Sequence, residues 1–130
     1  MVEFARQADD LEPGVACVIE LGYFLGLRVQ EAVMAGPDLA RWDDLLRHAT
    51  SDTPELRVSR GTKGGRLRQA AIFEVPELLN AISRAREVAR TRDGCLIPGE
   101  LPQAISRVYT VSSEIGMTGP HSPHAARYGY

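Results

Sequence analysis

The sequence has only two cysteines, Cys17 and Cys95, and a single lysine, Lys63, among its 130 residues. Two cysteines are too few for the disulfide framework of a small secreted domain, so we expect reduced thiols in a reducing compartment. No apolar run approaches the roughly 20 residues that span a bilayer. The first residues also lack the basic and apolar regions of a secretory signal, which makes the cytoplasm the expected location.

Aromatic residues are scarce at 6%, but hydrophobic residues make up 44% of the chain and charged residues 25%. These two fractions are ordinary for a globular protein, so an entirely disordered chain is not expected. A chain of 130 residues has the length of one domain with one core.

The net charge of −2 is unevenly distributed. Residues 1–56 have eleven acidic and four basic residues, whereas residues 57–130 have six acidic and eleven basic residues. The densest basic stretch, LRVSRGTKGGRLR, contains no acid. Such a patch is typical of a surface that binds a polyanion such as nucleic acid, and the alternative is a solvated basic hairpin. Its basic residues are Arg57, Arg60, Lys63, Arg66 and Arg68.

Apolar patterning predicts three helices in the first half of the chain. Residues 14–27 are apolar on nearly every face, which predicts a buried central helix with Pro13 in its first turn and Asp9 or Asp10 as its N-cap. A second helix over residues 28–35 is expected to end at Gly36-Pro37, where Asp38 would cap a third. On that third helix one apolar face is expected, formed by Leu39, Trp42, Leu45 and Leu46.

The second half of the chain predicts a hairpin and two more helices. Apolar and basic residues alternate in residues 55–60 and less regularly in 66–73, on either side of the Gly-rich GTKGG. A helix is expected from Pro76 to about Arg92, and another beginning at Pro102. Along this last helix, one row of side chains is expected to face the core. That row would consist of Ile105, Val108, Ser112 and Ile115. The predicted fold class is α+β, mainly helical with one small antiparallel sheet.

Four residues are candidates for a chemical role, each with a structural alternative. Arg28 follows the apolar helix and must pair with an anion or reach solvent, and Glu31 one turn later is an available partner. Lys63 lies at the expected tip of the hairpin, in a string that lacks the order of a P-loop. Near the end of the chain, His124 and Arg127 are three residues apart, a spacing that can direct both side chains at one phosphate.

A metal site is not expected in this sequence. His121 and His124 have a spacing that could begin one, but no Cys, Asp or Glu lies near enough in sequence to complete it. No cofactor is implied by any other motif.

The order of these features resembles the tyrosine recombinases, also called phage integrases. Their catalytic domains show a TGLRxxE segment, a hairpin lysine near KGGK and an HxxR motif, and here LGLRVQEAV, GTKGG and HAAR follow in that order. The resemblance covers almost the whole chain. It implies the catalytic core fold of DNA breaking–rejoining enzymes, with Arg28, Lys63, His124 and Arg127 as catalytic residues and Glu31 in support.

Two features depart from the family pattern. HxxR usually continues in an HxLRHT-like string, whereas here Tyr128 occupies a place where His or Thr is common. The family's nucleophilic tyrosine lies a few dozen residues beyond HxxR, and none of the four tyrosines holds that place: Tyr128 and Tyr130 are too close to Arg127, and Tyr23 and Tyr109 lie in the wrong helices. We therefore expect residues 1–130 to form a partial catalytic domain, without the N-terminal core-binding domain or the C-terminal nucleophile segment.

The resemblance also implies how the chemistry would proceed. Two arginines would bind the non-bridging oxygens of a pentacoordinate phosphorane, and the lysine would protonate the leaving 5′-oxygen, which arginine cannot do near neutral pH. The partner is double-stranded DNA, no metal or cofactor takes part, and the covalent step needs a tyrosine. This polypeptide alone is therefore expected neither to cut nor to rejoin DNA. Further DNA contacts are expected from Arg57, Arg60, Arg66 and Arg68.

Three hypotheses follow: a truncated recombinase catalytic domain, a non-catalytic DNA-binding module on the same scaffold, and a helical protein-interaction domain. The module could pair with an intact recombinase that donates a C-terminal segment. A domain without its last helices should expose apolar surface at Val18, Leu21 or Leu25, which favours a homo-oligomer or a marginally stable monomer. Binding to DNA would place the protein in the cytoplasm at the nucleoid, with no membrane contact.

Overall fold

The computed structural model describes residues 2–50, 54–62, 68–72 and 74–117 of the chain. These residues form six α-helices, one 3₁₀ turn and two strands, so the prediction of a mainly helical fold is confirmed. The helices and strands are α1 (Val2–Leu11), α2 (Pro13–Leu25), α3 (Val29–Val33), α4 (Leu39–Arg47), β1 (Glu55–Val58), β2 (Arg68–Ala71), α5 (Val75–Arg90) and α6 (Leu101–Glu114), with the 3₁₀ turn at Gly36–Asp38.

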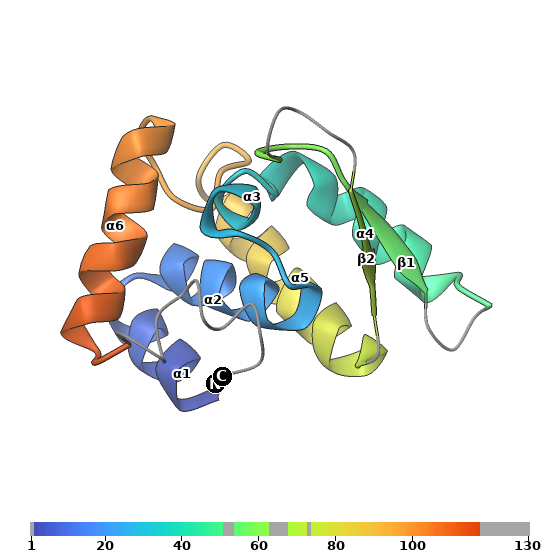
Figure 1. The fold of residues 1–130 in the computed structure, drawn as a ribbon, viewed down its shortest axis with the longest axis horizontal. Helices are drawn as coiled ribbons and strands as arrows, with labels where there is room; N and C mark the ends of the chain where they lie inside the picture. The colour runs from blue at the N-terminus through green and yellow to red at the C-terminus, as the bar shows by residue number, and fades with distance from the viewer. Residues whose placement is uncertain (1, 51–53, 63–67, 73, 118–130) are drawn as a thin grey trace.

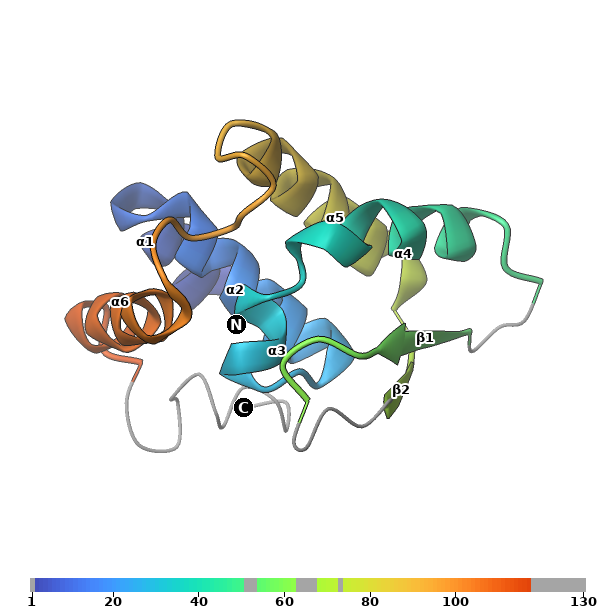
Figure 2. The same cartoon turned by 90° about the horizontal axis from the view of Figure 1, so that it is seen from above.

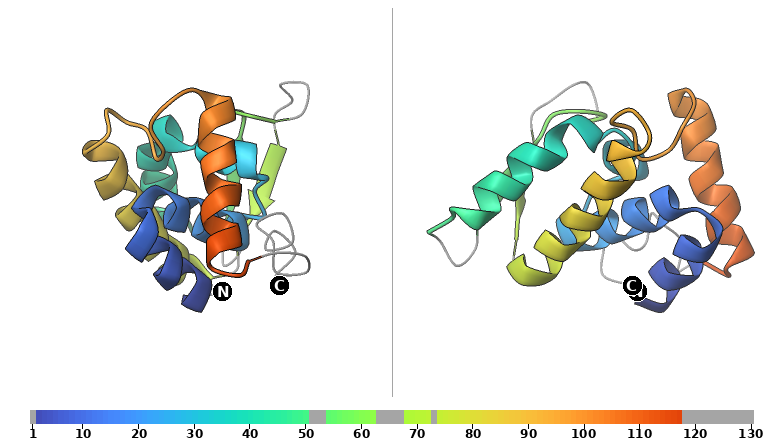
Figure 3. Two further views of the ribbon diagram at one scale, coloured as in Figure 1. Left: turned by 90° about the vertical axis from the view of Figure 1, so that its left-hand side faces the viewer. Right: turned by 180° about the vertical axis from the view of Figure 1, so that it is seen from behind.

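Helix α2 lies in the middle of the molecule. Helices α1 and α6 lie at one end, while α4 and the two strands lie at the other (Figure 1). Seen from above, α5 and the strands are on opposite sides, with α4 between them (Figure 2). Helix α5 crosses the back of α2 (Figure 3). The central position of α2 agrees with its apolar sequence, because a helix that is hydrophobic all round has to be enclosed by other elements.

The N-terminal end of α2 differs from the sequence prediction. Asp9 and Asp10 are not its N-cap, because both lie within α1, a helix that the sequence did not predict. The cap is Glu12, whose carboxylate accepts a hydrogen bond of 3.1 Å from the backbone N–H of Gly14. Pro13 begins the helix as predicted, since the first turn does not need its missing N–H.

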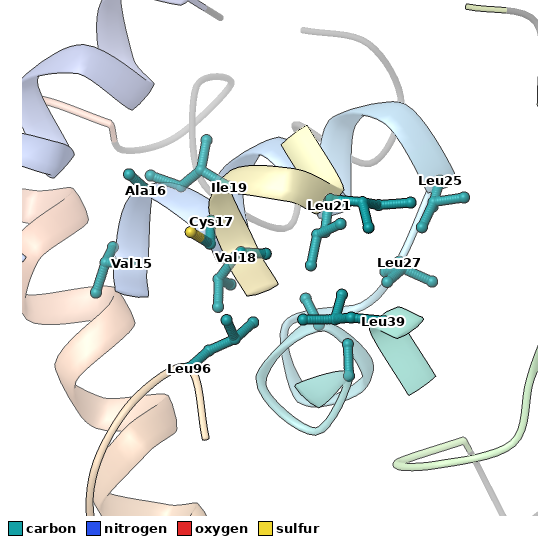
Figure 4. Close-up of a cluster of buried hydrophobic side chains, with 14 of the residues drawn as sticks. Val15, Ala16, Cys17, Val18, Ile19, Leu21, Leu25, Leu27, Leu39 and Leu96 are labelled. Atoms are coloured by element: carbon teal, nitrogen blue, oxygen red, sulfur yellow. The ribbon is translucent and has the colours of Figure 1, made fainter. Parts of the chain in front are cut away.

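The core is built on α2, where nine of the thirteen residues are buried. Val18, Leu21 and Leu25, which were expected to be exposed, have exposed fractions of only 2%, 0% and 4% (Figure 4). That expectation is wrong because α1, α3, α5 and α6 all contact α2 and cover it. The apolar patch that was expected to drive association is therefore not present around α2.

Two of the predicted helix faces are rotated in the structure. On α4, Leu45 is 47% exposed and Asp43 is buried in its place, because the Asp43 carboxylate is paired with Arg86 of α5. On α6, Val111 is fully buried while Ile105 is only partly buried. The other predicted inward residues of α4, which are Leu39, Trp42 and Leu46, are buried as expected.

Strands β1 and β2 form a two-stranded antiparallel sheet, in which Glu55 pairs with Ala71 and Val58 with Arg68. Along β1 the side chains alternate between exposed and buried, so that Arg57 faces solvent. This is the period expected for a strand with one face on the core. Residues 63–67, which join the strands, lie outside the described residues.

Within the described ranges, no helix is both long and apolar enough to cross a membrane.

The two thiols differ in exposure, which predicts a difference in reactivity. Burial raises the pKa of Cys17 to about 12, with a smaller contribution from Glu20, whereas Cys95 is exposed. Because the thiolate is the reacting form, we expect a disulfide reagent at pH 8 to modify one thiol per native chain and two in guanidinium chloride. In Cys95→Ser the native count should fall to zero. Rapid modification of Cys17 in the native chain would contradict the described burial.

Candidate functional site

The candidate site begins where α2 ends. Gly26 stops α2 in the left-handed conformation, with φ of 65°, and Arg28 follows as the N-cap residue of α3 with extended backbone. The Glu31 carboxylate, 1% exposed, accepts a hydrogen bond of 2.8 Å from the backbone N–H of Arg28. Glu31 therefore fixes the backbone of Arg28 from within the core.

The Arg28 side chain is half-buried. Among the described residues, its guanidinium forms no hydrogen bond or ion pair, and no Arg28–Glu31 ion pair is found. The sequence offered such a pair as the simplest structural role for both residues. The structure instead shows the Glu31 carboxylate bonded to the backbone N–H of Arg28.

Strand β1 is fixed to α4 by two hydrogen bonds to one carbonyl. The backbone oxygen of Arg57 accepts from the Trp42 indole N–H at 3.1 Å and from Nη2 of Arg41 at 3.2 Å. Trp42 is 1% exposed, so its N–H has to find a partner inside the protein. The Arg57 side chain is exposed and forms no ion pair with any described residue.

The segment that leaves β1 lies directly on α3 (Figure 2). Gly61 has a φ of 73°, and a Cβ there would lie 2.9 Å from the backbone oxygen of Gln30 and 3.0 Å from Sδ of Met34. Only glycine permits this approach. Thr62 is the last described residue before Lys63, so the chain reaches the helix that begins at Arg28 just ahead of the lysine.

Arg60, in the same segment, is paired with a buried carboxylate. Oxygens of Asp38, which is 5% exposed, lie 3.4 Å from Nε of Arg60 and 3.4 Å from Nη2 of Arg41. Asp38 stands at the N-cap position of α4 but makes no capping hydrogen bond, so the capping role predicted for its side chain is wrong. Its carboxylate is directed at the two arginines instead.

The remaining predicted site residues fall outside the described part. Lys63, Arg66, His121, His124 and Arg127 all lie there, and of Arg68 only the backbone, as the first residue of β2, is described. Their roles stay predictions. Within the described ranges, no three His, Cys, Asp or Glu residues come together in a group that could hold a metal ion.

A cavity of about 420 Å³ lies between α1, α2 and α5. Three carboxylates line it, those of Asp9, Glu20 and Glu77, together with Arg6 and Arg84. Arg84 donates to both oxygens of Glu20, and this hydrogen bonding raises the pKa of the Arg84 guanidinium. The cavity therefore presents an excess of negative charge, which does not favour a phosphodiester. Its lining comes from three separate helices, so no local motif in the sequence predicts it.

A comparison with protein families finds a match that covers the whole chain. The family described as Integrase matches residues 1–130. No curated protein and no solved structure matches the sequence.

The contact of Gly61 with α3 predicts the effect of adding a methyl group. Gly61→Ala should destabilise the fold by about 1–3 kcal/mol, because both the positive φ and the contacts with Gln30 and Met34 oppose a Cβ. Gly116→Ala is the matched control, with φ of 81° and no atom within 4 Å of the new methyl, and should cost about 1 kcal/mol. Urea unfolding followed by the fluorescence of Trp42 measures both. Equal losses would contradict a tight contact at Gly61.

Proposed function

The chain belongs to the integrase family, and from this premise we propose that it forms the phosphate-binding part of a tyrosine-recombinase catalytic domain. Such a domain breaks and rejoins double-stranded DNA through a phosphotyrosyl intermediate. One observation carries the proposal: Gly61 packs on α3, so the segment leading into Lys63 reaches the helix that begins at Arg28.

Arg28 would bind the non-bridging oxygens of the scissile phosphate. Its guanidinium is permanently charged, presents donors in a planar fork and has no counterion among the described residues. Because Glu31 fixes the backbone at Arg28, a phosphate would meet donors on an anchored residue. Preorganised donors of this kind stabilise the charge that develops in a transition state.

Lys63 would act as the general acid that protonates the leaving 5′-oxygen. The chain uses arginine at every other basic position, and only an amine can release a proton near neutral pH. His124 and Arg127 would complete the site by analogy with the family's HxxR motif. Support for these three residues comes from the sequence, since they lie outside the described residues.

Double-stranded DNA would run along the exposed face of β1. Arg57 supports this orientation, because it projects from the strand toward solvent and pairs with no described residue. Arg66 and Arg68 would extend the same basic surface. Arg60 differs from them, since its guanidinium is already paired with Asp38.

The nucleophile is proposed to be neither Tyr23 nor Tyr109. The Tyr23 ring packs edge-on against Phe24, with centroids 5.2 Å apart, and lines the acidic cavity, where a phosphodiester is disfavoured. Tyr109 is exposed on α6. If no tyrosine completes the site, the same surface would serve as a non-catalytic DNA-binding module.

We expect salt-sensitive binding to a generic DNA duplex, measured by fluorescence anisotropy over a salt series. Arg28→Ala and Arg57→Gln should each weaken binding and lower the slope of log affinity against log salt by about one, because each removes one phosphate contact. Arg90→Gln is the matched control. It removes the same charge from an exposed arginine of α5 that is paired with Glu87, and should leave the slope unchanged. No binding at low salt, or equal effects of all three variants, would contradict the proposed surface.

The polypeptide of residues 1–130 alone should form no covalent complex with a nicked duplex, because none of its tyrosines is expected to reach the scissile phosphate. Denaturing electrophoresis of end-labelled DNA would detect such a complex. A labelled protein band that disappears when one of the four tyrosines is replaced by phenylalanine would identify that tyrosine as the nucleophile and overturn this expectation.

A further inference from the structure

Two buried carboxylates near α4 have similar surroundings. Asp38 and Asp43 are 5% and 6% exposed, and each is paired with two arginines. Asp43 contacts Nε of Arg47 at 2.7 Å and Nη1 of Arg86 at 2.5 Å. A buried carboxylate that loses its partners is left with a large desolvation cost, so the arginines beside both acids compensate their burial. The Asp43 contacts are hydrogen bonds, whereas the two Asp38 ion pairs are longer, at 3.4 Å.

The arginines paired with Asp43 and with Asp38 belong to different parts of the fold. Arg47 and Arg86 belong to α4 and α5, so Asp43 joins two helices. Asp38 is paired with Arg41 of α4 and with Arg60, which directly precedes Gly61 in the segment that leaves β1. The Asp38–Arg60 ion pair therefore links the α3–α4 junction to this segment.

We propose that Asp38 is a positioning residue, which through Arg60 holds the segment after β1 against α3, the helix that Arg28 caps. The inference rests on the proposed function and deepens it. In this role Arg60 positions the segment after β1 and does not itself contact DNA. Its pairing with a buried carboxylate separates these two roles, because the exposed Arg57 pairs with no residue that the structure describes.

The first readout is the position of the segment itself. The methyl group of Met34, on the sulfur that Gly61 approaches, should give one of only three methionine signals in a ¹³C-methyl NMR spectrum, assigned by Met34→Leu. In Asp38→Asn this signal should move toward the position of an unpacked methionine. In the control Asp43→Asn, which neutralises an equally buried acid, it should stay near its wild-type position.

The second readout is DNA affinity, where positioning and simple electrostatics predict opposite signs. Removing a negative charge should strengthen binding to DNA by long-range attraction, and Asp43→Asn should follow this rule. Asp38→Asn should instead weaken binding several-fold. Arg28→Ala should cost about tenfold in the wild type and in Asp43→Asn, but less than about threefold in Asp38→Asn, because the displaced segment and Arg28 would then no longer bind the same stretch of DNA together.

Arg60→Gln provides a second variant if Asp38→Asn does not fold, because Arg60 is half-exposed and its loss leaves Asp38 paired with Arg41. It should move the Met34 signal and weaken the effect of Arg28→Ala in the same way. An unchanged Met34 signal in these variants, or tighter DNA binding by Asp38→Asn with a full effect of Arg28→Ala, would overturn the inference. If the Met34 signal moves but no variant binds DNA, the anchoring by Asp38 stands and the proposed function fails.

Discussion

The approach of Gly61 to the backbone of α3 is the contact on which the candidate site depends. Arg28 is fixed by the turn after α2 and by Glu31, whereas the chain that leads to Lys63 belongs to a strand attached to α4. Nothing in the covalent chain brings these two parts together. They meet because a residue without a Cβ at position 61 lets one backbone lie against another.

Four ion pairs join the acidic first half of the chain to its basic second half. Glu12, Glu20, Asp38 and Asp43, all in the acidic first half, are paired with Arg92, Arg84, Arg60 and Arg86 of the basic second half. Part of the basic excess is therefore neutralised within the protein by residues distant in sequence. The cations that remain without a described partner, Arg28 and Arg57 among them, are a better guide to a polyanion surface than the charge balance alone.

How far the sequence predicts the molecule depends on the range of the interaction concerned. The apolar run of α2 and the alternation along β1 are local patterns, and both elements form where they were expected. Leu45 was expected inside because its own helix gives no sign of Arg86, the residue of α5 that draws Asp43 inward. The approach of residue 61 to Gln30 also joins distant segments, so Arg28 could be selected as a candidate but its surroundings could not.

Glu31 binds the backbone of Arg28, and this arrangement is compatible with a phosphate bound at the Arg28 side chain. A carboxylate that paired with the guanidinium would have to be displaced by any incoming phosphate, at the expense of a formed ion pair. The buried Glu31 carboxylate binds the backbone N–H of Arg28 and so restrains the position of this residue. Among the described residues, no bond between Glu31 and the Arg28 guanidinium is found. Among the residues that the structure describes, the half-buried Arg28 guanidinium has no counterion, and a bound phosphate would supply one.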